Sequence, residues 1–292
     1  MTTTRIILLG DKKRKRLPAP RTKWGMGAPY TALAIVGAFA LIPVAWMIVT
    51  AATSEADVFQ FPQSLAREYT LSNYWFVLTD PTLLGFVANG LLVSFVTCFC
   101  SLLVGFFAGY AFSKFRFRGR TTMMFLILTA QMVPQVLLLV TLYTAFDRVG
   151  MLDTYLALII SYTTFTLPLS VMMMKNSFDA LPDALLEAAR LDGASELRTM
   201  FSVMMPAVRT PMIAVCLFSF IRAWNDLPFA LTLVDTERQT LPAGLSLMFT
   251  GEFQNAYGEM MAASIITSLP VVIIFFVLQK HFVSGALTGA VK

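Results

Sequence analysis

The sequence predicts an all-α integral membrane protein with six transmembrane helices and with both ends of the chain in the cytosol. Three observations predict this fold class: the composition, the lengths of the apolar stretches, and the positions of the basic residues. Of the 292 residues, 57% are hydrophobic and 13% are charged, whereas ordinary globular domains carry about a quarter charged residues. We therefore expect most of the chain to lie in hydrocarbon.

The first apolar stretch, residues 29–52, follows a basic tail that covers residues 1–28. At roughly 23 residues, this stretch is long enough to cross a bilayer and longer than the apolar region of a secretory signal peptide. We therefore predict an uncleaved first transmembrane helix that is preceded by a cytosolic tail.

Five further apolar stretches form a core over residues 84–282, and each is long enough to cross the bilayer. The predicted spans are about 84–112, 123–143, 155–174, 207–234 and 260–282. Gly105 and Gly109 lie four residues apart in the first of these, which permits the close approach of a neighbouring helix. Residues 283–292 are predicted to be a cytosolic tail.

The basic residues set the orientation of these spans. Eighteen of the 22 Lys and Arg residues lie in segments that the topology places in the cytosol or, for Arg209 and Lys280, at the cytosolic ends of spans, three lie in external loops, and Arg222 lies deeper within a span. Cytosolic loops of membrane proteins carry such an excess. The topology therefore explains the net charge of +5, and we expect a lipid bilayer and no nucleic acid as a partner.

A polar stretch, residues 181–206, interrupts the apolar sequence between the fourth and fifth spans. Its composition predicts two short helices that meet at an angle around Gly193, because glycine accepts the left-handed conformation that ends a helix. Ser195 is placed to cap the second helix, and Pro206 marks its exit. The charges of this stretch predict a cytosolic position.

The spacing within this stretch resembles the EAA loop of ABC importer permeases. The matching residues are Glu187-Ala188-Ala189, then Gly193, then Val203 to Pro206. The family usually has Ile and Leu where this chain has Val203 and Met205, and both changes preserve an apolar face. The resemblance implies the type I ABC importer permease fold and a loop that docks into a separate ATPase. It assigns the coupling surface to Glu187, Ala188, Ala189, Asp192 and Gly193, with small residues at 188, 189 and 193 for close backbone approach.

Three further runs resemble one branch of these permeases. They are Trp224-Asn225-Asp226, Gln239 to Leu245, and Gly289 to Lys292. Together with the loop, they are similar to the MalG-like permeases of the carbohydrate uptake transporter-1 family, over nearly the whole chain from Tyr30 on. The resemblance implies a multi-pass subunit of a bacterial or archaeal plasma membrane that imports a sugar. The implied partners are a second, MalF-like permease, an ATPase dimer that binds ATP and Mg, and an extracytoplasmic sugar-binding protein.

The chain itself carries no motif for catalysis or for nucleotide binding. It contains no phosphate-binding sequence of the form G-x-x-x-x-G-K-[ST], and no H-E-x-x-H or paired-cysteine motif. Its three cysteines lie in apolar runs without the spacing of metal ligands. We therefore expect a transporter subunit that is not an enzyme, with no cofactor and no metal site of its own.

Polar residues within the third and fifth spans are the candidates for a translocation path. Gln131 and Gln135 flank Pro134, and Trp224, Asn225 and Asp226 follow Arg222. Polar groups in hydrocarbon are costly unless they face protein or water. The third span is therefore either a kinked packing helix or part of the path. The fifth-span residues either anchor the helix at the interface or face a polar cavity, with Arg222 and Asp226 paired on one helix face.

Two other functions fit parts of the sequence. One is an ABC permease for a non-sugar solute, such as an amino acid or an oligopeptide. The other is an ion-coupled secondary transporter, which should show intramembrane acids or broken helices repeated between two halves. Only Asp226 is such an acid, and no matching half-repeat is visible.

Overall fold

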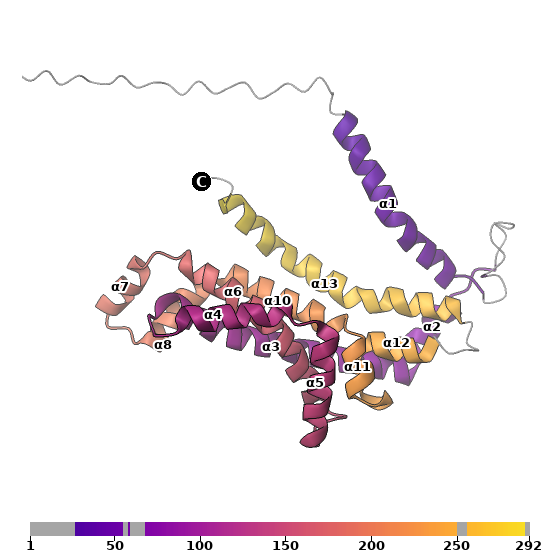
Figure 1. Cartoon of the computed structure of the whole chain (residues 1–292). Helices are drawn as coiled ribbons and strands as arrows, with labels where there is room; N and C mark the ends of the chain where they lie inside the picture. Colours follow the sequence, from indigo (N-terminus) through magenta and orange to yellow (C-terminus); the bar gives the residue numbers. More distant parts are fainter. Residues whose placement is uncertain (1–26, 55–57, 59–67, 250–255, 290–292) are drawn as a thin grey trace, which may run out of the picture. The chain divides into compact units, whose positions relative to one another are not determined.

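The computed structural model describes residues 27–54, 58, 68–249 and 256–289. Within these residues the regular structure is helical, apart from one isolated bridge between Thr53 and Tyr69. Figure 1 labels the helices. Their bounds are α1 Gly27–Ala51, α2 Ser72–Thr79, α3 Pro81–Lys114, α4 Arg120–Thr129, α5 Gln135–Arg148, α6 Tyr155–Asp179, α7 Ala184–Leu191, α8 Glu196–Thr199, α9 Met205–Ala207, α10 Arg209–Trp224, α11 Pro228–Leu233, α12 Leu241–Phe249 and α13 Tyr257–Gly289.

The chain divides into two compact units, residues 1–46 and 47–292. The first unit contains most of α1, whose stretch Pro29–Ala51 has a mean hydropathy of 2.5 and is long enough to cross a membrane. The rest of the predicted N-terminal tail, residues 1–26, lies outside the described residues. All further description concerns the second unit.

Three helices of the second unit, α3, α6 and α13, are each long and apolar enough to cross a membrane. Two bent pairs complete the set of six: α4 with α5, and the helical stretch Glu196–Ala207 with α10. The all-α, six-span fold class is thus confirmed. The predicted sixth span lies within α13, which continues to Gly289 and so includes most of the predicted C-terminal tail.

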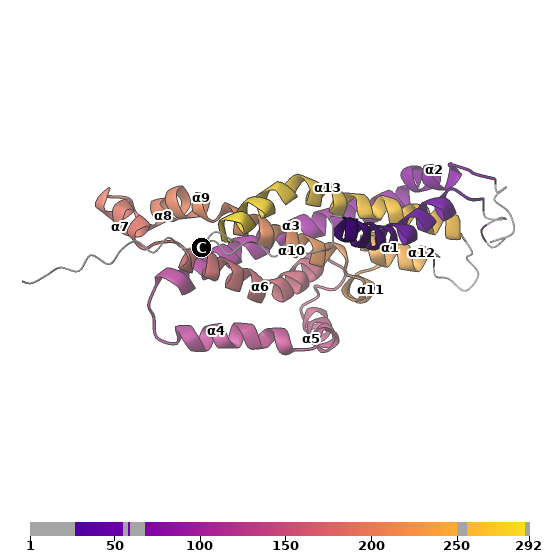
Figure 2. The same ribbon diagram turned by 90° about the horizontal axis from the view of Figure 1, so that it is seen from above.

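Helices α3 and α6 form the centre of the fold, and they lie side by side in Figures 1 and 2. A Cβ atom added to Gly105 would lie 2.9 Å from the Cβ of Ser170, and one added to Gly109 would lie 2.6 Å from the Cβ of Met174. The two glycines therefore allow the backbones to touch, as their spacing predicted. One turn earlier in the same interface, the hydroxyls of Ser101 and Thr166 are 2.6 Å apart.

Ser101 meets Thr166, Gly105 meets Ser170, and Gly109 meets Met174. In each pair the residue of α6 lies 65 positions after its partner in α3, so the two helices run parallel. Two parallel helices place the end of the first and the start of the second on opposite sides of the bilayer. The segment between them must therefore cross once, and α4 with α5 is the part that crosses.

The third span differs from the single helix predicted over residues 123–143. Helices α4 and α5 meet at an angle of 101°. Pro134 has no N–H to continue the helix and disfavours helical backbone at the residue before it. Val133 and Pro134 accordingly leave the helical region, with ψ values of 123° and 133°. The prediction of a kink was correct in position, but the bend is a break between two helices.

The fifth span also differs from the continuous helix predicted over residues 207–234. Helix α10 meets the preceding helical stretch at 79° and ends at Trp224. Pro228 explains this end, because its missing N–H is the one that would bond to the carbonyl of Trp224. A separate short helix, α11, then begins at Pro228.

Candidate functional site

The loop over residues 181–206, here called the coupling loop, turns sharply at Gly193. Gly193 has φ +74°, in the left-handed region. Its N–H donates to the carbonyl of Arg190, and the N–H of Ala194 donates to that of Ala189, both at 3.0 Å. This pair of bonds satisfies the carbonyls at the end of α7. The hydroxyl of Ser195 then accepts from the N–H of Arg198 at 3.3 Å, so the predicted break and cap are both confirmed.

The coupling loop is tied to the end of α3 by charged side chains. The Lys114 ammonium lies 2.7 Å from a carboxylate oxygen of Asp183 and donates to the carbonyl of Leu181 at 3.2 Å. The hydrogen bond from Lys114 lowers the pKa of Asp183 below its ordinary value. On the far side of the turn, Glu196 accepts from the Tyr110 hydroxyl at 3.1 Å and pairs with Arg190 at 2.6 Å. A force on the loop is therefore passed directly to α3.

The outer surface of the loop includes most of the predicted coupling residues. Glu187, Ala188, Asp192 and Gly193 are exposed. Ala189 is not: it is 6% exposed and belongs to the buried part of the chain. The core cluster behind the loop, which includes Leu186 of the same helix, comprises Phe106, Tyr110, Met174, Phe178, Leu186, Met200, Met204, Val208 and Val215. Leu186 and Ala189 share the inward face of α7, so Ala189 differs in exposure from the other four residues, and its role in coupling stays a prediction.

Two leucines on this surface were missed. Leu191 is 89% exposed and Leu197 is 65% exposed. Both are large apolar side chains in a charged stretch of the chain. The helical periodicity could have revealed the exposure of Leu191, because this residue falls outside the apolar stripe that Leu186 and Ala189 form on α7.

A second feature is a cavity of about 470 Å³ where the break between α4 and α5 faces α6 and α10. Gln131 and Gln135 line it from either side of the break, and Arg222 lines it from α10. Its other lining residues are Ala130, Val133, Leu138, Thr164, Phe165, Pro168, Leu169 and Phe218. The structure thus brings both predicted glutamines together with an arginine from a distant part of the sequence.

Trp224 and Asn225 line a different cavity, of about 330 Å³. Trp224 is 3% exposed, and its ring stacks on that of Phe220 with centroids 5.7 Å apart. The exposed Asn225 donates from its side chain to the carbonyl of Ile221 at 3.0 Å. These two path candidates therefore lie apart from Gln131 and Gln135.

Asp226 has a structural position that differs from the prediction. Since α10 ends at Trp224, Asp226 is not one turn beyond Arg222 on a helix, and the structure shows no ion pair between them. Its carboxylate accepts instead from the Tyr162 hydroxyl and from the N–H of Phe229, both at 3.0 Å. Asp226 is 7% exposed and lines neither cavity described above. It joins the start of α11 to α6.

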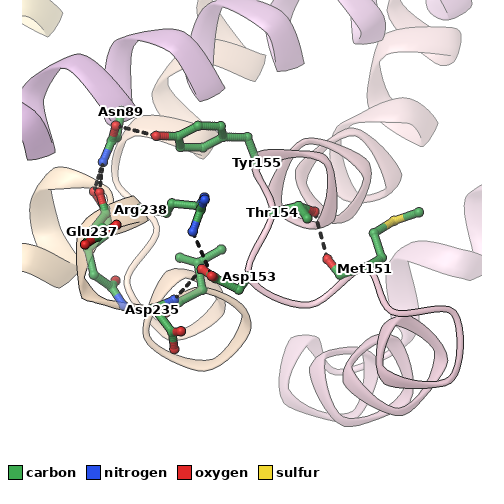
Figure 3. Close-up of polar contacts among 10 residues, drawn as sticks. Asn89, Met151, Asp153, Thr154, Tyr155, Asp235, Glu237 and Arg238 are labelled. Carbon is green, nitrogen blue, oxygen red and sulfur yellow. Dashed lines mark hydrogen bonds and ion pairs between the residues drawn. The ribbon is translucent and has the colours of Figure 1, made fainter.

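Figure 3 shows a polar network at the end of α3 away from the coupling loop. Asp153 has φ 54°, which is unusual for a residue with a side chain, and its carboxylate lies 2.7 Å from the Arg238 guanidinium. Asn89 donates to the carbonyl of Glu237 at 2.9 Å and accepts from the Tyr155 hydroxyl at 2.8 Å. The network fixes the loop before α12 against α3 and α6. This network could not be predicted from the sequence, because its members are far apart along the chain.

Comparison with known proteins identifies what this arrangement resembles. Residues 101–287 match the family described as "Binding-protein-dependent transport system inner membrane component". The chain is 35% identical to the inner membrane ABC transporter permease protein YcjP of Escherichia coli, over 90% of this chain and 95% of that protein. It is 34% identical to the trehalose/maltose transport system permease protein MalG of Thermococcus litoralis, over 89% and 96%.

Two further likenesses extend this comparison. The diacetylchitobiose uptake system permease protein NgcG of Streptomyces coelicolor is 28% identical over 86% of this chain and 84% of its own. Among solved structures, a subunit of a bacterial ABC transporter involved in the import of the acidic polysaccharide alginate superposes with a TM-score of 0.74 at 24% identity. That superposition covers 87% of this chain and 95% of that one.

Proposed function

Because the chain belongs to the family of binding-protein-dependent transport system inner membrane components, we propose that it is the permease subunit of an ATP-driven sugar importer. Two of the relatives described above are named for the transport of trehalose and maltose and for the uptake of diacetylchitobiose, and these names support a sugar as cargo. Members of the family are permease subunits and not enzymes. We assign ATP and Mg to a separate ATPase dimer, which docks on the coupling loop.

The observation that carries this proposal is the construction of the coupling loop. It presents exposed Glu187, Ala188, Asp192 and Gly193 beside an 89% exposed leucine, Leu191. Its inner side is fastened to α3 through the contacts of Lys114 and Tyr110. A surface that is open on one side and rigidly attached on the other suits the transmission of movement from a partner.

The spans provide a route for that movement. Helix α3 is in backbone contact with α6 at Gly109, so the two helices move together when the loop is displaced. Helix α10 packs on both of them and carries residues of both cavities. Tilting this group would change access to the cavities from one side of the membrane to the other. A second, homologous permease would complete the enclosure, and an external binding protein would deliver the sugar.

The orientation of the chain is part of this proposal. We place the coupling loop, the N-terminal tail and the C-terminus in the cytosol, as the distribution of basic residues favours. The network of Asp153 and Arg238 then lies at the outer surface, where the binding protein would dock.

The test is sugar uptake into proteoliposomes that contain the chain with its partner subunits and binding protein. We expect uptake that requires ATP inside the vesicles and that is lost in Gly193→Val. Valine is strained at a left-handed φ, which costs about 1–3 kcal/mol. Gly193→Asn is the matched control, because asparagine tolerates this conformation and no atom lies within 4 Å of the position of a Cβ.

Three outcomes would count against the proposal. Uptake driven by an ion gradient without ATP would indicate a secondary transporter. ATP-dependent uptake of amino acids or peptides in place of sugars would indicate a permease for another solute. Unchanged sugar uptake in Gly193→Val would remove the coupling role of the turn.

A further inference from the structure

The cavity at the break between α4 and α5 is lined by an arginine and by no acidic residue. Among the residues that line it, Arg222 is the only charged one, and none is Asp or Glu. No ion pair of Arg222 occurs in the part of the chain that the structure describes. The acidic residue nearest to it in sequence, Asp226, attracts Arg222 electrostatically, but its carboxylate lies outside the cavity and accepts hydrogen bonds from Tyr162 and Phe229.

The position of Arg222 makes such a charge costly. It lies in the last turn of α10, roughly 20 Å along the helix from Arg209 at 1.5 Å per residue. With Arg209 near the cytosolic surface, as the proposed orientation has it, this places Arg222 within a bilayer core that is about 30 Å thick. A cationic side chain at that depth faces a polar cavity or an anionic partner. The chain supplies the cavity, and because no acidic residue lines it, an anion bound there would come from outside the chain.

The other lining residues indicate what kind of anion fits. Gln131, Gln135 and Thr164 offer amide and hydroxyl groups of the kind that bind sugar hydroxyls, while Phe165 and Phe218 offer apolar faces for a ring. An acidic side chain from a neighbouring subunit could pair with Arg222 without using the other polar groups of the cavity. A cavity of about 470 Å³ with several polar groups instead suits a polar small molecule.

We propose that this cavity binds the transported sugar and that Arg222 recognises an anionic substituent on it, so that the substrate class is acidic sugars. A carboxylate suits a guanidinium because the two planar groups form paired hydrogen bonds. Gln131 and Gln135 then bind neutral hydroxyls of the same molecule. This inference rests on the proposed function, and it makes Arg222 a residue that determines specificity.

The test measures sugar binding to the complete transporter complex without its external binding protein, so that the selectivity of that protein does not enter. The probes are matched disaccharides: digalacturonate against galabiose, and cellobiouronate against cellobiose. Binding is measured as the ligand-dependent shift in the thermal unfolding temperature. We expect at least one acidic sugar to bind about tenfold or more tightly than its neutral counterpart.

Variants of Arg222 locate the source of that preference. Arg222→Gln should lower the affinity for the acidic sugar by about tenfold or more and leave the affinity for the neutral sugar unchanged. Arg222→Lys should keep part of the preference, because it keeps the charge and loses the paired geometry. Arg209→Gln is the control, since it removes an exposed cation from the other end of the same helix. Size-exclusion chromatography verifies that each variant complex is assembled.

Each other outcome overturns the inference. A neutral sugar that binds as tightly as its acidic counterpart excludes an acidic substrate, as does the absence of binding by both acidic probes. If the preference for the acidic sugar survives in Arg222→Gln, Arg222 does not recognise the anionic substituent. If that variant instead separates the two permeases without changing sugar preference, Arg222 pairs with an acid of the partner. ATP-dependent uptake of neutral sugars alone would preserve the proposed function while rejecting this inference.

Discussion

Asp226 illustrates how a charged residue within the membrane region can serve the fold. Its carboxylate is buried and accepts from the Tyr162 hydroxyl on α6 and from the N–H of Phe229 at the start of α11. Both donors are in the interior of the chain, where an unmade hydrogen bond is expensive. The residue thus determines where α11 begins and holds it against α6.

Replacing this carboxylate should therefore destabilise the protein. We expect Asp226→Ala to cost about 1–3 kcal/mol, because it leaves the Tyr162 hydroxyl and the Phe229 N–H without an acceptor. The neighbouring Asn225→Ala is the control: Asn225 is exposed and bonds only within its own helix end, so its loss should cost less than about 0.5 kcal/mol. The measurement is unfolding in detergent followed by circular dichroism. Equal effects of the two changes would contradict the structural role of Asp226.

At the scale of the elements, the contact between α3 and α6 organises the second unit. A Cβ on Gly109 would lie 2.6 Å from the Cβ of Met174 and 2.8 Å from the backbone N of Lys175. Backbone atoms cannot move aside as a flexible side chain can. The two helices can therefore lie this close only because residue 109 has no side chain. The same separation places Lys114 and Tyr110 where they meet the coupling loop.

Gly109→Ala should accordingly destabilise the protein by about 1–3 kcal/mol, as overpacking does in a closely packed interior. Gly85 provides a matched control on the same helix, because nothing lies within 4 Å of its Cβ position. Gly85→Ala should be neutral or slightly stabilising, since alanine is the better helix former. Thermal unfolding of both variants side by side tests this. A loss of stability as large in Gly85→Ala would mean that helix packing is not the cause.

At the scale of the whole molecule, the exposed apolar surface of the coupling loop is where we expect assembly with the ATPase. Leu191→Ser should weaken co-purification of the ATPase with the permeases by about tenfold, because one fully buried leucine contributes about 1.5–3 kcal/mol. Leu78, which is 54% exposed on α2, provides the control. Leu78→Ser should leave the yield of ATPase unchanged. An equal yield in both variants would remove Leu191 from the docking surface.

Features that depend on neighbouring residues could be predicted from the sequence. The turn at Gly193, the cap at Ser195 and the close approach at Gly105 all follow from local chemistry or from spacing on one helix. Six spans follow from the lengths of apolar runs. The location of the break at Pro134 also follows, because proline lacks the N–H.

Features that depend on distant contacts could not be predicted. The 101° angle at Pro134 is one such feature, because a proline predicts the position of a break but not its angle. Asp226 hydrogen-bonds to Tyr162, 64 residues away along the chain, so it attracts Arg222 without the direct ion pair that a continuous helix would have allowed. The cavity shared by Gln131, Gln135 and Arg222 likewise exists only once these segments have folded together.

The parallel contact of α3 and α6 also has a consequence for biosynthesis. Each contact joins residues 65 positions apart, and chains are made at about 5–20 residues per second. The glycine-lined face of α3 therefore exists for roughly 3 to 13 seconds before the helix that covers it has been synthesised. During that interval the face is available to lipid, to the translocation machinery or to a membrane chaperone. The delay between the synthesis of α3 and its packing against α6 is thus set by the number of residues that separate the two helices in the sequence.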